Sequence, residues 1–206
     1  MSWDITKIRG PQKGIWYSLL VMLDIFSRYV VGCCVVRRSN AKVAEHFVSE
    51  VVEREKLEPG QVILHNDRGT EMTAETFCAH LDMLGITRSL SRPHVSDDNP
   101  FSESAFKTLK YHRDYPDRFG CIEDAKSFFR GFFPWYNFEH RHSGISMLTP
   151  ATVHEGNAGT VLAVRHGTML GAHAAKPERF INGKPKIKTL ATEVWINRPS
   201  DDAAAA

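Results

Sequence analysis

The chain has 206 residues, of which 42% are hydrophobic, and its formal net charge is +2. This size predicts one domain with a substantial core. No stretch of about 18 apolar residues is present, which excludes a transmembrane helix, and the N-terminus lacks a secretory signal pattern. The four cysteines have no CxxC spacing, so we expect reduced, buried side chains in a cytosolic protein rather than a zinc site.

Basic residues gather late in the chain. Residues 157–199 hold seven Lys or Arg and two Glu, whereas residues 1–156 hold 19 basic and 20 acidic residues. This distribution fits a near-neutral catalytic body and a basic segment that binds phosphate groups. A solvated surface without a partner would have the same pattern, so charge alone does not decide between the two.

Hydrophobic patterning predicts an α/β fold. Strands are expected over residues 2–8, 17–23, 29–36, 61–65 and 86–90. Helices are expected over residues 41–56, 73–84, 100–111, 122–140, 150–155 and 157–171. Because helices separate the last three strands, parallel crossovers follow, and the whole is a mixed five-stranded sheet flanked by helices. Two further short strands are expected near residues 186–190 and 193–197.

Local signals mark several element boundaries. Asn40 and Asn99 are predicted helix N-caps, and Pro100 follows at the first helical position. Gly85 is predicted to stop the helix that precedes it. The polar loop 91–99 is expected to be a mobile flap that responds to substrate.

Three acidic residues, Asp4, Asp67 and Glu103, stand where a metal site can form. Asp4 lies in the first expected strand, Asp67 follows the fourth, and Glu103 lies in the first turn of a helix. Singly, each has an ordinary explanation as a surface residue, a turn residue or a helix N-terminal acid. Together they lie at strand ends and a helix start that can meet at one edge of the sheet. Clustered carboxylates repel one another unless a cation neutralises them, so we expect Mg²⁺ or Mn²⁺.

Two lysines follow Glu103 on the same face of its expected helix, Lys107 at i+4 and Lys110 at i+7. We predict that they contact DNA phosphate beside the metal site. Ordinary solvated lysines would show the same spacing.

Several motifs match a known family jointly. They are Trp3-Asp4-Ile5-Thr6, Leu23-Asp24-Ile25-Phe26-Ser27-Arg28, Val31-Gly32, His65-Asn66-Asp67-Arg68-Gly69, Asp98-Asn99-Pro100, Glu103-Ser104, Phe106-Lys107-Thr108-Leu109-Lys110, Tyr136-Asn137, Arg141-His142 and Thr149-Pro150. Through them the chain resembles, over roughly residues 1–155, the catalytic core of the DDE transposases of IS3-like bacterial insertion sequences, which is related to retroviral integrases. The 35 residues between Asp67 and Glu103, and the lysine seven residues after Glu103, also follow the family pattern.

The resemblance implies an RNase H-like fold with Asp4, Asp67 and Glu103 as the catalytic, metal-binding triad and Lys110 at the DNA end. It implies a polynucleotidyl transferase that cuts DNA at transposon ends with water. The enzyme then joins the 3′-hydroxyl to a target phosphodiester, using two Mg²⁺ or Mn²⁺ ions. The implied partners are transposon and target DNA and other copies of the chain, in the bacterial cytoplasm and at the nucleoid when DNA is bound.

We expect a catalytic core over residues 1–155, a basic extension over 156–199 and a disordered tail over 200–206. Family members usually carry an upstream helix-turn-helix region, whereas this chain starts within the first expected strand. An excised core, a second reading frame or a remnant is therefore expected. Two alternatives stay open: a non-catalytic DNA-binding or assembly remnant, and an RNase H-type nuclease that only hydrolyses.

Two further features are interpreted as structural. Asp24 follows a buried strand and matches the family pattern, but the triad is complete without it. His140, Arg141 and His142 at a helix end are interpreted as packing and capping groups, because no paired Cys or acidic ligand stands nearby in the sequence.

Overall fold

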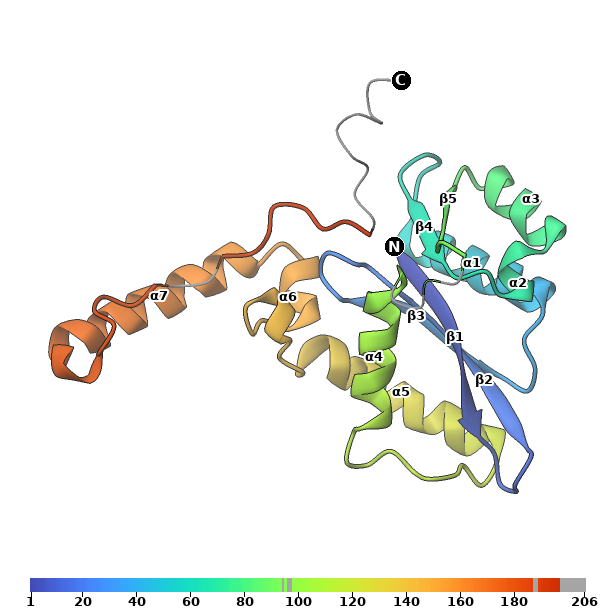
Figure 1. The fold of residues 1–206 in the computed structure, drawn as a ribbon, viewed down its shortest axis with the longest axis horizontal. Helices are drawn as coiled ribbons and strands as arrows, with labels where there is room; N and C mark the ends of the chain where they lie inside the picture. The colour runs from blue at the N-terminus through green and yellow to red at the C-terminus, as the bar shows by residue number, and fades with distance from the viewer. Residues whose placement is uncertain (94, 96–97, 187–188, 197–206) are drawn as a thin grey trace.

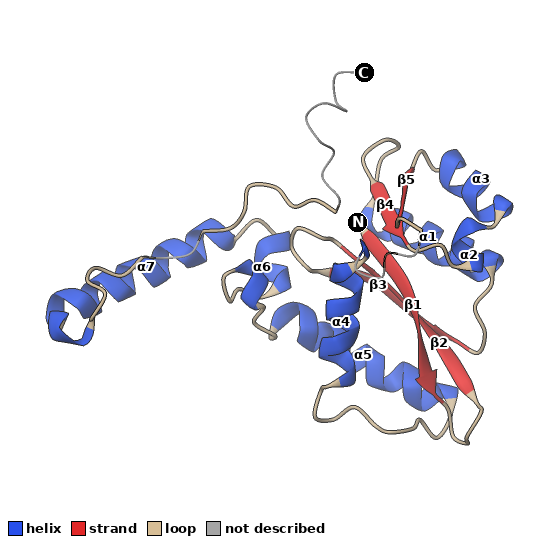
Figure 2. Cartoon of the chain, viewed as in Figure 1, coloured by secondary structure: helices blue, strands red, loops and turns tan. Residues whose placement is uncertain are grey.

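Five strands form one mixed sheet in the order β3–β2–β1–β4–β5 (Figure 2). This computed structural model describes residues 1–93, 95, 98–186 and 189–196. The strands are β1 (Ser2–Arg9), β2 (Trp16–Leu23), β3 (Val30–Val36), β4 (Ile63–Asn66) and β5 (Thr87–Leu90). β1, β2 and β3 pair antiparallel, whereas β4 pairs parallel with both β1 and β5. The predicted mixed sheet is therefore confirmed.

Helices cover both faces of the sheet (Figure 1). On one face lie α1 (Ala41–Glu55), α2 (Thr70–Thr73) and α3 (Glu75–Met83), and on the other lie α4 (Pro100–Lys110) and α5 (Ile122–Phe138). A hydrophobic core lies on each face of the sheet, and alternate residues of β2 pack into one or the other. Leu20 packs into the core on the α1 side, and Leu19 and Val21 pack into the core on the α5 side. This explains why β2 reads as a continuous apolar run.

Two motif residues dock helices onto β3. A Cβ on Gly32 would come within 2.5 Å of Val51 Cγ2, so only glycine lets α1 approach β3 this closely. Asn137 of α5 accepts a hydrogen bond from the Val30 N–H (2.9 Å) and donates one to the Val30 carbonyl (3.0 Å). A buried side-chain amide thus satisfies both backbone groups of Val30.

Two predicted helix signals are confirmed, and two predictions are corrected. Asn40 caps α1 by accepting from the Val43 N–H, and Gly85 follows α3 with φ +68°. The helix predicted over 73–84 begins two residues later, as α3, because Ala74 is extended (ψ 134°). The short helix α2, which the sequence did not predict, precedes it. The break between the two helices lets Met72 and Phe77 both reach the core on the α1 side. The cysteines are free, but the prediction that they are buried is wrong: Cys33 on the edge strand β3 is exposed, and the other three are half-buried.

The C-terminal part contains α6 (Pro150–His154), α7 (Ala158–Ala175) and short 3-10 turns at Ser143–Ile145 and Pro177–Arg179. α7 extends away from the sheet (Figure 1). The strands predicted near 186–190 and 193–197 are not formed by the residues described there, because no strand runs beside them. Their apolar side chains pack instead: Leu190 lies against the cluster around α6, and Trp195 lines a cavity beside Met1. Residues 187, 188 and 197 lie outside the described part, as does the tail predicted over 200–206.

Candidate active site

The pairing of β1 with β4 sets Asp4 level with Asp67. These parallel strands are paired at Ser2 and His65, where the His65 N–H donates to the Met1 carbonyl (2.9 Å). Asp4 comes two residues after Ser2 on β1, where side chains two apart point to the same face, and Asp67 comes two residues after His65. Asp67 directly follows β4. The two carboxylates thus stand at the point where the strands part.

Hydrogen bonds to β1 and β4 position the start of α4. Ser2 Oγ donates to Asn99 Oδ1 (2.5 Å) and lies 2.8 Å from Ser102 Oγ, and Asn99 Nδ2 donates to the Trp3 carbonyl (3.3 Å). His65 Nε2 lies 2.9 Å from the Asp98 carbonyl. All of these side chains are buried. We call Ser2, Asn99 and Ser102 the α4 latch.

The α4 latch brings Glu103 to the edge that carries Asp4. Ser2, Asp4 and Thr6 alternate along β1 on the face that α4 covers, and Ser2 contacts the first turn of that helix. Glu103 is the next residue after Ser102, is exposed, and donates its N–H to the Asn99 carbonyl (3.2 Å). Asn99 occupies the predicted N-cap position, but its side chain makes no capping hydrogen bond, because it is used to hold β1.

The charges of Asp67 and Glu103 act on Asp4. Burial is the main reason that the pKa of Asp4 is raised to about 7, since it removes water from the ionised form. A hydrogen bond from the Ile5 N–H (2.7 Å) opposes this rise. The negative charges of Asp67 and Glu103 raise the pKa of Asp4 further, and the positive charge of Lys110 lowers it. Such coupling requires Asp67, Glu103 and Lys110 each to lie near Asp4.

The two predicted DNA-binding lysines differ in their surroundings. Lys110 Nζ donates to Thr6 Oγ1 (2.8 Å), two residues beyond Asp4 on the same face of β1. Lys107, one turn earlier on α4, is exposed and has no side-chain hydrogen bond or ion pair within the described part of the chain. Lys110 is therefore fixed beside the carboxylates, whereas Lys107 points to solvent.

The donor set suits a hard cation such as Mg²⁺, because three carboxylates offer oxygen ligands only. Burial and mutual repulsion hold the pKa of Asp4 high, and a cation would relieve both effects. Among the described residues, no group of three His, Cys, Asp or Glu side chains is gathered closely enough to hold a metal ion. The structure thus places the three carboxylates at one edge without drawing them onto a single point.

Asp98 is a site neighbour whose role sequence reasoning missed. Its side chain is 2% exposed and forms an ion pair with Arg92, at 2.7 Å from Nη2 and 3.0 Å from Nε. This pair joins the two ends of the loop that precedes α4. An acid directly before the helix start was the only signal in the sequence. The flap expected over 91–99 stays a prediction, and residues 94, 96 and 97 lie outside the described part.

Asp24 and the histidines near 140 hold local structure. Burial alone would raise the pKa of Asp24, but hydrogen bonds from the Ser27 hydroxyl and from the Ser27 and Phe26 N–H groups lower it. These bonds close the turn between β2 and β3. His142 accepts from the Gly144 N–H, and His140 stacks on Tyr136. These contacts agree with the structural roles predicted for Asp24 and both histidines.

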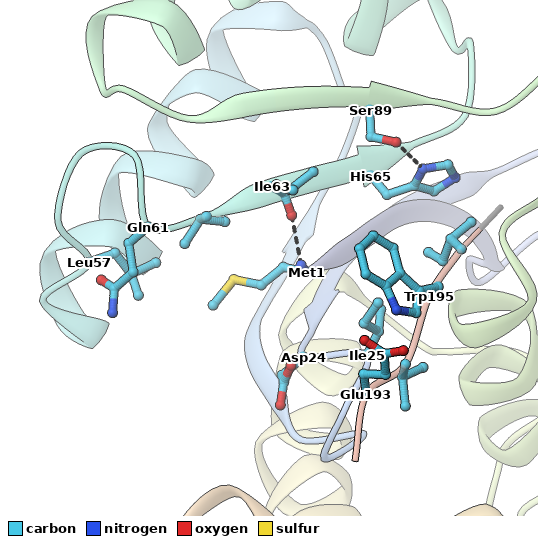
Figure 3. A pocket seen from close by; sticks show the side chains of 13 residues that line it. Met1, Asp24, Ile25, Leu57, Gln61, Ile63, His65, Ser89, Glu193 and Trp195 are labelled. Carbon is cyan, nitrogen blue, oxygen red and sulfur yellow. Dashed lines mark hydrogen bonds between the residues drawn. The ribbon is translucent and has the colours of Figure 1, made fainter. Parts of the chain in front are cut away.

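A cavity of 620 Å³ lies near the start of β1 (Figure 3). Met1, His65 and Asp24 line it, and Trp195 reaches it from the C-terminal segment. Asp4, Asp67 and Glu103 do not line it. The candidate active site is thus an open edge of the sheet rather than this cavity, as suits a substrate too large for a pocket.

Comparison with known proteins identifies the family of this chain. Two family models, each described as an integrase core domain, match residues 1–96 and 84–150. The chain is 30% identical over 156 residues to the transposase for insertion sequence element IS904 of Lactococcus lactis subsp. lactis (strain IL1403). It is also 30% identical over 148 residues to transposase InsF for insertion sequence IS3A of Escherichia coli (strain K12). This chain carries an integrase core domain of the IS3-like transposase family.

The matches cover 75% and 71% of this chain, but only 60% and 50% of the two transposases. This chain therefore spans about half to three fifths of the length of these curated relatives.

Solved structures share the fold. The catalytic core domain of BIV integrase has a TM-score of 0.52 at 20% identity, covering 77% of this chain and 96% of that one. A chain of the simian T-cell lymphotropic virus intasome, solved with PP2A regulatory subunit B56 gamma, has a TM-score of 0.56 at 17% identity. That match covers 74% of this chain and 53% of the other. The predicted RNase H-like fold is confirmed. None of the described helices combines the length and apolar character that a membrane crossing needs.

Proposed function

We propose that this integrase core cleaves DNA strands at transposon ends and transfers the resulting 3′-hydroxyl to a target phosphodiester, in a reaction that depends on Mg²⁺ or Mn²⁺. The proposal rests above all on the gathering of Asp4, Asp67 and Glu103 at one open edge of the sheet, where the last two raise the pKa of Asp4. The family membership of residues 1–150 supports the same substrate class.

The three carboxylates would hold the metal. When bound, two divalent ions would supply activation of the attacking oxygen and stabilisation of the leaving oxygen in an in-line displacement. Metal binding requires an ionised Asp4, so the cation and a proton compete for this carboxylate.

Other residues of the chain would bind and orient the DNA. Lys110, held by Thr6 beside Asp4, offers a positive charge to a phosphate next to the reacting bond. The α4 latch fixes Glu103 relative to β1, which limits the reorganisation that the site needs before reaction. Lys107, exposed on the same helix, offers a second phosphate contact.

Glu103→Gln tests the proposal, because it removes the charge and keeps the size of an exposed side chain. We expect it to abolish Mn²⁺-dependent nicking of plasmid DNA and strand transfer of an end oligonucleotide, without changing the melting temperature measured in EDTA. Glu75→Gln, an exposed glutamate at the start of α3, is the matched control and should keep both activities. Persistence of nicking in the Glu103→Gln protein would show that the triad assignment is wrong.

The same assay separates the competing hypotheses. A nuclease that only hydrolyses would nick DNA but join no 3′-hydroxyl to a target. A DNA-binding or assembly remnant would bind DNA while the wild-type chain neither nicks nor joins it. Binding of Mn²⁺, followed by calorimetry on the wild type and on Glu103→Gln, gives a readout that does not depend on turnover.

A further inference from the structure

One edge of β1 lacks a strand partner beyond the candidate active site. β4 pairs with β1 only at Ser2, so β1 and β2 run on past β4 toward their hairpin (Figure 1). Two surface cavities lie there, of 480 Å³ and 520 Å³. Lys7 and Trp16 line both cavities, so the two adjoin. We call the two together the hairpin channel.

The hairpin channel carries a positive charge. Five basic residues line it against two acidic ones: Lys7, Arg9, Arg37, Arg38 and Lys110 against Glu71 and Asp117. Both acids already have partners. Asp117 pairs with Arg9 (2.5 Å), and Glu71 accepts from Ser39 Oγ (2.5 Å).

Several of the basic groups stay available for a ligand. Arg37 and Arg38 are exposed, and neither makes a side-chain hydrogen bond or ion pair within the described residues. Lys7 and Lys110 are held only by hydroxyl groups, at 2.8 Å from Ser18 Oγ and Thr6 Oγ1 respectively. Neither lysine forms an ion pair within the described residues, although Lys7 lies near enough to Glu71, and Lys110 near enough to Asp4, to lower the pKa of that acid. Arg37 and Arg38 therefore present unpaired positive charges, and Lys7 and Lys110 add to the positive charge of the channel.

An aromatic ring stands between the two halves of the channel. Trp16 is 49% exposed although it begins a buried strand. A large apolar side chain left in water beside unpaired cations costs free energy unless a ligand covers it. Exposed aromatic rings flanked by basic groups are the surface on which proteins stack unpaired bases while binding the phosphates.

The channel is continuous with the candidate active site. Lys110 lines its first cavity and is near enough to Asp4 to lower the pKa of that carboxylate. A strand whose phosphodiester lay at Asp4 would therefore pass Lys110 first, then Lys7 and Trp16, and then reach Arg37 and Arg38. Basic residues on an open strand edge can also simply oppose aggregation, but that role explains neither Trp16 nor the arginines beyond β3.

We propose that the hairpin channel binds a single-stranded stretch of the DNA substrate next to the reacting phosphodiester. Phosphates lie on Lys110, Lys7, Arg37 and Arg38, and one unpaired base stacks on Trp16. This inference rests on the proposed function for its choice of DNA as the ligand.

The test is fluorescence anisotropy of the full chain with labelled DNA in EDTA, so that cleavage does not interfere. Two probes are compared, a blunt duplex and the same duplex with a single-stranded flank. The first test variant is the double substitution Arg37→Gln/Arg38→Gln. Its control is Arg113→Gln/Arg130→Gln, which removes the same charge from exposed sites outside the channel. Trp16→Ala has Phe138→Ala as its control, another exposed aromatic residue outside it.

The arginine pair should lower the slope of log Kd against log salt by about 1.5, as expected for two lost phosphate contacts. Trp16→Ala should weaken binding of the flanked probe roughly 5- to 150-fold and leave the blunt duplex nearly unchanged. If each variant had the same salt slope and the same affinity for both probes as its control, the inference would be overturned and the proposed function would stand. Binding of polyglutamate as tight as that of DNA would overturn it in favour of an acidic protein partner. A wild-type chain that binds neither probe would refute the inference and the proposed substrate class together.

Discussion

The α4 latch predicts that Asn99→Ala lowers both stability and activity. Asn99 is 4% exposed, accepts from the Ser2 hydroxyl at 2.5 Å and donates to the Trp3 carbonyl at 3.3 Å. Alanine leaves both partners short of one hydrogen bond in a buried place. Each such loss costs about 1–3 kcal/mol. Because Ser2 keeps its contact with Ser102, we expect a total of about 2–4 kcal/mol.

For a chain of this size, 1 kcal/mol changes the melting temperature by about 2–4 °C. Asn99→Ala should therefore melt roughly 5–15 °C lower in a thermal scan, and urea unfolding should show a lower midpoint with an unchanged slope. Release of the helix start also displaces Glu103 from Asp4. Since a shift of about 1 Å can cost about 10²-fold in rate, nicking should fall by more than the loss of folded protein explains.

The control is Ser104→Ala, an exposed serine on the same helix, which should change neither quantity. A cycle with Ser2→Ala adds a direct test, because the effects of the two substitutions should be less than additive if they break the same bonds. An Asn99→Ala protein with wild-type melting temperature and activity would refute the argument. Asn99 would then occupy the N-cap position of α4 without its side chain stabilising the fold.

Two further predictions concern the charges of the site. The pKa of Asp4 is raised to about 7 in the folded state from 3.8, so the folded chain holds the proton more tightly than the unfolded one. Stability from this group is present below about pH 4 and is lost as pH rises to about 7. Asp4→Asn should therefore melt higher than wild type at pH 8 in EDTA and lose that advantage at pH 4, and an equal difference at both pH values would contradict the assigned cause. Addition of Mn²⁺ at pH 8 should raise the melting temperature of the wild type, by about 2.7 kcal/mol of stability at 100 times the dissociation constant, but not that of Glu103→Gln. An equal rise in both proteins would place the ion elsewhere.

The helices and strands of the core could be predicted because their signals are local. The apolar run of β2, the Asn40 cap and the Gly85 stop each act within a few residues, and each is found where it was expected. The short helix α2 was not predicted, because its four residues are too few to show a helical period. Its Met72 packs in the same core as Phe77 of α3.

The described residues of the two expected C-terminal strands form no strand, for a related reason. An alternating pattern predicts a half-buried strand, but a strand also needs a neighbour whose edge is free. In the structure Leu190 and Trp195 pack as single side chains against other parts of the molecule. Sequence patterns describe one segment and carry no information about which edge is available to it.

The sequence by itself determined which carboxylates to consider and that they would follow strand ends and a helix start. Tertiary structure decided how they meet. The register of Ser2 with His65 sets Asp4 level with Asp67, and the Ser2–Asn99–Ser102 hydrogen bonds bring Glu103 to the same edge. These contacts join residues about 60 to 100 positions apart. The physical reason is that burial and Coulomb repulsion depend on distance in space, so the raised pKa of Asp4 arises only once the chain has folded.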